Sequence, residues 1–168
     1  MISLAEAIKL KSILKQKISE LSMEISTVAY TVVEKGEEPK TPSRTIQQVE
    51  ADLAVVRKDA RTLDRLIYRA NIDNFIEFNG EKLAIVEAIE LATQLRAEAG
   101  QAKAFGMSEK ESYMHSMGET ILYNVALFEP EEYRVRAIKL EKQAHRLSNI
   151  INAKNYQVQI DFDDSMYF

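Results

Sequence analysis

The feature that most constrains this chain is an apolar seam that repeats at three- and four-residue steps. It has no polar interruption and consists of Ile46, Val49, Leu53, Val56, Ala60, Leu63, Ile67 and Ala70. Apolar residues at heptad spacing share one face of an α-helix, and that face needs another apolar surface to cover it. The sequence therefore predicts a long helix here, which begins after Pro42 with Ser43 as its N-terminal cap.

A second heptad seam precedes the first. It consists of Leu4, Ala7, Leu14, Ile18, Leu21, Ile25, Val28 and Val32. Lys11 is its one polar exception. Gly36 and Pro39 end the pattern, because glycine favours a left-handed cap and proline cannot continue the hydrogen-bond ladder. The short connection makes the two helices antiparallel neighbours, so we expect a helical hairpin over residues 3–71.

Beyond this hairpin the pattern is less regular. We expect a short extended piece over 72–80, a helix over 82–104, a loop and short strand over 105–128, a helix over 130–153 and a C-terminal tail over 154–168. Asn79-Gly80 is the dipeptide best suited to a tight turn with positive φ. The β-forming run from Thr120 to Phe128 is a candidate to pair with the Phe75–Phe78 piece. No internal repeat is evident.

These seams determine the expected fold class. Long heptad seams on three helices are more apolar surface than one thin hairpin can cover, so the pattern predicts an all-α fold. We expect a single domain over all 168 residues, built as an antiparallel four-helix bundle with a minor short β element. Self-association into a homo-oligomer is expected to bury what remains of the seams.

Composition excludes several classes of function. The chain has no cysteine, so it holds no disulfide, thiolate metal site or cysteine nucleophile, and the cytoplasm is the expected compartment. The net charge of −4 argues against binding to a nucleic acid duplex. Four lysines interrupt the first apolar segment, so neither a signal peptide nor a membrane span is expected there. They are Lys9, Lys11, Lys15 and Lys17.

The sequence also offers no catalytic set. The two histidines each follow a glutamate by four residues, as Glu111/His115 and Glu141/His145, and solvated ion pairs explain them better than a metal site does. No nucleophile stands in a glycine elbow, and there is no glycine-rich phosphate loop. We therefore expect a protein that is not an enzyme and holds neither metal nor cofactor.

The most unusual surface feature is a row of arginines spaced four residues apart: Arg57, Arg61, Arg65 and Arg69. Like charges at this spacing destabilise a helix, so each should have a compensating group. One interpretation is internal neutralisation by Asp59, Asp64 and acidic residues of a neighbouring helix. The other is a short stripe that holds phosphate or carboxylate groups through guanidinium contacts.

The second interpretation gives a sharper hypothesis, in which the helix end forms part of a pocket that binds and sequesters an anionic, nucleotide-like small molecule. The candidate ligand-binding residues are Arg61, Arg65, Tyr68, Arg69, Asn71 and Asn74. The main alternative is an interaction or scaffold protein whose helical surfaces contact another protein. A membrane-active protein is the weaker alternative, because the seam beside the N-terminal lysines needs burial along its full length.

Five motifs also link the chain to a known family. They are Leu4-Ala5-Glu6-Ala7, Gly36-Glu37-Glu38-Pro39, Arg69-Ala70-Asn71-Ile72-Asp73-Asn74, the glycine turn before Leu83, and Asn155-Tyr156. In this order they resemble the septicolysin-like family of small bacterial helical proteins. The resemblance implies a helical, self-associating protein of bacterial or phage type. Asp73 stands where that family carries threonine, which weakens the transfer of any ligand.

Overall fold

The computed structural model describes residues 1–167 and divides into two compact units. The first unit comprises Met1–Asn74 with Asn155–Phe168, and the second comprises Phe75–Lys154. The single domain expected over residues 1–168 stays a prediction.

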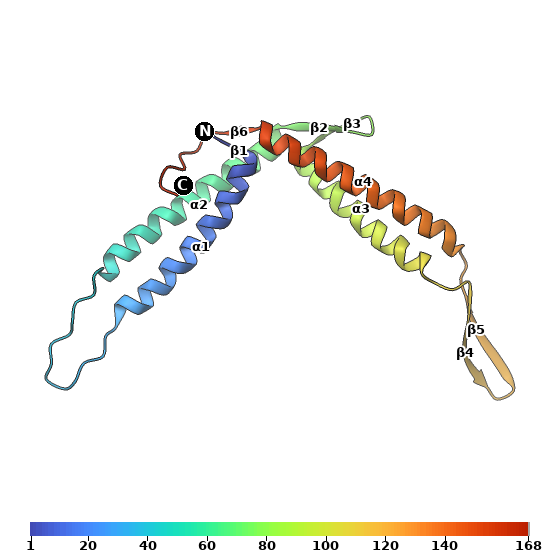
Figure 1. Ribbon diagram of the computed structural model, residues 1–168, viewed down its shortest axis with the longest axis horizontal. Coiled ribbons are helices and arrows are strands. Elements are labelled where there is room, and N and C mark those ends of the chain that lie inside the picture. Colours follow the sequence, from blue (N-terminus) through green and yellow to red (C-terminus); the bar gives the residue numbers. More distant parts are fainter. Residues whose placement is uncertain (168) are drawn as a thin grey trace. The chain divides into compact units, whose positions relative to one another are not determined.

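The first unit is a helical hairpin with a small β pair (Figure 1). Its elements are β1 (Ile2–Ser3), α1 (Leu4–Ala29), α2 (Ile46–Asp73) and β6 (Gln159–Ile160). The heptad seams meet between α1 and α2, where Leu14 and Leu63 are fully buried. The N-terminal cap of α2 is Thr45, whose hydroxyl accepts a hydrogen bond of 3.3 Å from the Gln48 amide, so the predicted cap at Ser43 is two residues early.

The second unit is also a helical hairpin, with a two-stranded sheet at each end of its helices (Figure 1). Its elements are β2 (Phe75–Phe78), β3 (Glu81–Ala84), α3 (Ile85–Gly106), β4 (Glu111–Met117), β5 (Thr120–Val125) and α4 (Pro130–Gln157). Small residues are prominent among the buried side chains of α3 and α4, among them Ala92, Ala99 and Ala144. A Cβ atom built on Gly106 would lie 2.8 Å from the Arg134 Cα atom, so the two backbones approach closely there.

The predicted all-α four-helix bundle is wrong. The four helices account for 62% of the chain, but six strands in three antiparallel two-stranded sheets account for a further 15%, so the fold is mixed α/β. Within each unit, one pair of antiparallel helices covers its own seam. Heptad spacing shows that a helix face is buried, but it does not specify the helix against which that face packs.

The predicted pairing of residues 120–128 with Phe75–Phe78 is also wrong. Strand β2 pairs with β3 across the Asn79-Gly80 turn, where φ is +52° and +82°, as predicted for this dipeptide. Strand β5 pairs with β4, which lies in a segment expected to be loop. Neighbouring strands joined by a tight turn have a small loop-closure cost, and this favours local hairpins over the long-range pairing.

The structure also shows an internal repeat that is not evident in the sequence. The first repeat runs β1-α1-α2-β2 and the second runs β3-α3-α4-β6. The leading strand of each repeat pairs with the trailing strand of the other in the same register, because Ile2 faces Ile160 as Leu83 faces Ile76. Each first helix starts alike: the Ser3 amide donates to Glu6 at 2.7 Å, and the Ala84 amide donates to Glu87 at 2.8 Å.

With these elements aligned, the sequence correspondence becomes visible. Glu6-Ala7-Ile8 matches Glu87-Ala88-Ile89. The second helices and trailing strands match at an identical offset of half the chain length, in the pairs Leu63/Leu147, Ile67/Ile151, Ile76/Ile160 and Phe78/Phe162, all of them buried. The repeats differ most in the connection between their two helices, which is a loop in the first and the β4–β5 hairpin in the second.

Candidate functional site

The arginine row lies on the exposed side of α2. Arg69 forms an ion pair with Asp73, with 3.1 Å between Nε and Oδ2. Among the described residues, Arg57, Arg61 and Arg65 have no acidic side chain within ion-pair distance. Three of the four guanidinium groups are therefore exposed and uncompensated.

The two aspartates expected to neutralise this row are engaged elsewhere. Asp64 forms an ion pair of 2.6 Å with Lys11 of α1, which explains the one polar position in the first seam. The Asp64 carboxylate also raises the pKa of Lys11 above its ordinary value. Asp59 accepts a hydrogen bond of 2.6 Å from the Tyr167 hydroxyl. Neither Asp59 nor Asp64 therefore forms an ion pair with an arginine of the row.

The six predicted ligand-binding residues do not converge on one pocket. Arg61, Arg65 and Tyr68 lie on the exposed face of α2, and the Tyr68 ring lies under the Lys11 ammonium at 5.5 Å. The Asn74 side-chain amide donates to the Ala70 carbonyl at 2.9 Å and so caps the helix. Asn71 is half-buried beside it.

Two of the six, Arg69 and Asn74, line a recess of about 260 Å³ at the end of α2. The other lining residues are Leu66, Ala70, Asp73, Gln159, Ile160 and Asp161. The recess holds one guanidinium, already paired with Asp73, and a second carboxylate from Asp161. This excess of negative charge disfavours an anionic ligand, since like charges at short range repel.

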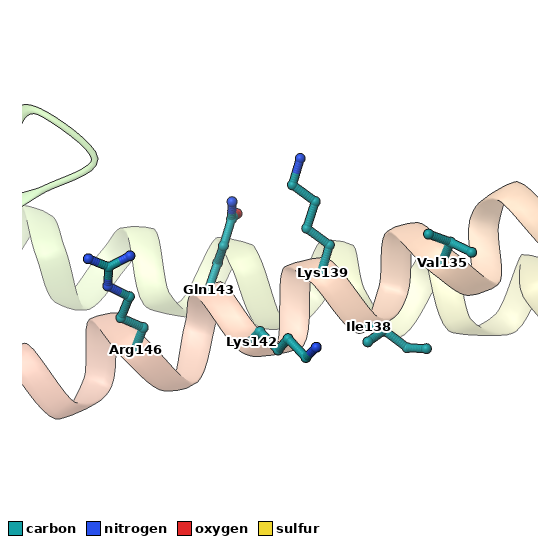
Figure 2. A pocket seen from close by; sticks show the side chains of 6 residues that line it. All are labelled: Val135, Ile138, Lys139, Lys142, Gln143 and Arg146. Atoms are coloured by element: carbon teal, nitrogen blue, oxygen red, sulfur yellow. The ribbon is translucent and has the colours of Figure 1, made fainter.

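A second hollow, of about 370 Å³, lies on the outer face of α4. Figure 2 shows that its side chains all come from this one helix and point away from the helix behind it: Val135, Ile138, Lys139, Lys142, Gln143 and Arg146. No second element encloses it. It is a basic helix face with two exposed aliphatic side chains, and the sequence signal for it is three cations at helical spacing.

The β4–β5 hairpin exposes several large apolar side chains. Tyr113 and Tyr123 are directly opposite one another, with ring centroids 6.2 Å apart. Because side chains alternate along a strand, Ile121 and Val125 share the face of Tyr123. All four side chains are 51–60% exposed. The sequence indicates a strand at residues 120–128, but it indicates neither the partner of this strand nor its exposed face.

The base of this hairpin is firmly attached to the ends of α3 and α4. The rings of Phe105, Phe128 and Tyr133 form a cluster with centroids 5.0 to 5.3 Å apart. Lys110 donates to the Phe128 carbonyl at 2.9 Å and to the Glu129 carboxylate at 2.6 Å. The exposed strands are thus held at a defined place relative to the helix pair.

The described residues contain no group of three His, Cys, Asp or Glu side chains placed to hold a metal ion. Glu111 and His115 both lie on strand β4, so their four-residue spacing does not place the two side chains on one helical face. Within residues 1–167, no helix is both long and apolar enough to cross a membrane.

No protein-family model matches the chain, and no curated protein is significantly similar to it in sequence. The fold is similar to the crystal structure of a functionally unknown conserved protein from Corynebacterium diphtheriae. The TM-score is 0.67 at 20% sequence identity, and the match covers 95% of this chain and 99% of the other. At this identity the similarity shows a shared fold and nothing about a ligand or partner.

Proposed function

We propose that this protein is a non-catalytic interaction protein that contacts another protein chain through its β4–β5 hairpin. The observation that carries the proposal is an isolated two-stranded sheet whose Tyr113, Ile121, Tyr123 and Val125 side chains are all more than half exposed. A two-stranded hairpin alone is marginally stable in water, and an exposed apolar patch on a defined element is typical of a contact site.

The internal repeat provides a comparison within the same molecule. The first repeat joins its two antiparallel helices by residues 30–45, which form no strand and contain Pro39 and Pro42. A simple loop is therefore sufficient for this connection. The hairpin of the second repeat exceeds what the connection requires, and this supports a separate role for it.

Site-specific photo-crosslinking in the native host tests the proposal. A photoreactive phenylalanine analogue at Tyr123 is expected to yield discrete protein adducts. The matched control is Tyr30, an 87% exposed tyrosine in the equivalent connection of the first repeat, where no discrete adduct is expected. The absence of adducts at Tyr123, or the same adducts at both positions, would contradict the proposal.

A second candidate function, capture of an anionic small molecule, is favoured by the uncompensated Arg57, Arg61 and Arg65. Their exposure supports surface binding of a phosphate-rich ligand rather than enclosure in a pocket. For both candidates we propose a cytoplasmic location, supported by the lack of cysteine. The motif resemblance supports a relationship to septicolysin-like proteins, and it also favours self-association.

A further inference from the structure

We propose that the occupant of the β4–β5 hairpin is a second copy of this chain, whose β5 strand pairs antiparallel with the first. The two hairpins then form one four-stranded sheet. This inference rests on the proposed function, because it names the partner of the same site.

The two outer edges of the hairpin differ. Strand β5 runs from Thr120 to Val125 without a charged residue, a proline or a bulge. Strand β4 begins at Glu111 and is interrupted by a bulge between Tyr113 and His115. Charged residues and bulges are the devices that protect sheet edges from pairing. The open edge is therefore β5, and its backbone groups can accept a further strand.

The chemistry of β5 favours a second copy over a different protein. The chain has a net charge of −4, so the repulsion between two copies is least costly for a contact made by uncharged segments. Thr120–Val125 is such a segment. In an antiparallel pair of identical strands, the two copies of Glu119 lie at opposite ends of the contact. A partner that binds through charge complementarity has no charged side chain on this edge to pair with.

The symmetry of this contact also sets its size. A two-fold axis perpendicular to the sheet keeps Ile121, Tyr123 and Val125 of both copies on one face, which makes the apolar patch continuous. Since the β4 edges are protected, assembly ends at a closed dimer and does not continue into a fibre.

Light scattering on the purified full-length chain tests the inference. The mass is expected to rise with concentration from 19.2 kDa towards twice that value, and to do so in high salt as well, because the contact is uncharged. Ile121→Lys is expected to weaken the dimer at least about tenfold, since a charged side chain on an edge strand opposes strand pairing. The matched control is Ile138→Lys on α4, where the side chain is 51% exposed against 57% for Ile121, and it should leave the dimer intact.

Amide hydrogen exchange on the unmodified chain is a second test that requires no variant to fold. Protection of β5 amides is expected to increase with protein concentration, while that of α2 amides should not. A mass of 19.2 kDa at every concentration, or dissociation by Ile138→Lys but not Ile121→Lys, would overturn the second-copy inference. Association that disappears in high salt would overturn it too. Crosslinks from Tyr123 to a different protein would then still support the proposed function.

Discussion

The Tyr167 hydroxyl donates a hydrogen bond of 2.6 Å to the Asp59 carboxylate, and this contact joins the C-terminal tail to the middle of α2. Asp59, which lies between Arg57 and Arg61 of the arginine row, is thereby hydrogen-bonded to the tail. The tail adds to the first unit through this contact and through Phe162, which is buried. We therefore expect the C-terminal tail to contribute to the stability of the first unit.

Tyr167→Phe should lower the free energy of unfolding by about 1 kcal/mol, the usual net value of one hydrogen bond. Burial and the hydrogen bond to Asp59 raise the pKa of Tyr167 above its ordinary value of 10.0. The folded state therefore retains the phenolic proton longer than the unfolded state. This part of the stability is complete below pH 10 and is lost as the pH rises through the higher folded-state pKa. Urea unfolding from pH 7 to pH 11 should show a steeper loss above pH 10 for the parent than for the variant, and equal slopes would contradict it.

Two glycines of α3 should respond in opposite directions to alanine. At Gly106 a Cβ atom would lie 2.8 Å from both the backbone nitrogen and the Cα of Arg134, so Gly106→Ala should destabilise the fold by about 1–3 kcal/mol. At Gly100 a Cβ meets nothing within 4 Å, so Gly100→Ala should stabilise it by about 0.5–1 kcal/mol through helix propensity. Denaturant unfolding of the two variants measures both signs. A gain at Gly106 would mean that α3 and α4 can separate at no cost.

The internal repeat makes a prediction about the helix caps. Ser3 caps α1, and its hydroxyl accepts a hydrogen bond of 3.2 Å from the Glu6 amide. Ala84 stands at the same place before α3 and has no hydroxyl. Ser3→Ala should lower the unfolding free energy by about 1 kcal/mol, and Ala84→Ser should raise it by up to about 1 kcal/mol. Thermal unfolding tests both, and a loss of stability on Ala84→Ser would argue that the two starts are not equivalent.

Local sequence patterns were sufficient to predict much of the secondary structure. The seam around Leu63 is buried as predicted, and Asn79-Gly80 forms the expected turn, because both features depend on residues close together in the chain. The choice of partner is not local. Nothing in the spacing of an apolar seam distinguishes a helix pair from a four-helix bundle, and for this reason the predicted fold class was wrong.

The repeat was missed for a related reason. Its matching positions are separated by connections of different kinds, a loop in one half and a β-hairpin in the other, so the two helices of each repeat match at different offsets. The contacts around the candidate site could not be predicted from the sequence for the same kind of reason. The arginine row is visible in the sequence, but the partners of Asp59 and Asp64, which are Tyr167 and Lys11, come from distant segments and are set by the tertiary fold.

The arginine row yields the last prediction. Residues four apart on a helix are separated by about 6 Å along its axis, so Arg57, Arg61 and Arg65 can each contact a different phosphate of one extended ligand. In a panel of nucleotides and cyclic nucleotides, the rise in Tm should therefore grow from mono- to triphosphate and disappear in high salt. Arg61→Ala with Arg65→Ala should abolish the rise without changing the ligand-free Tm, whereas the control Arg136→Ala on α4 should retain it. A flat panel would remove the small-molecule function and leave the hairpin as the candidate site.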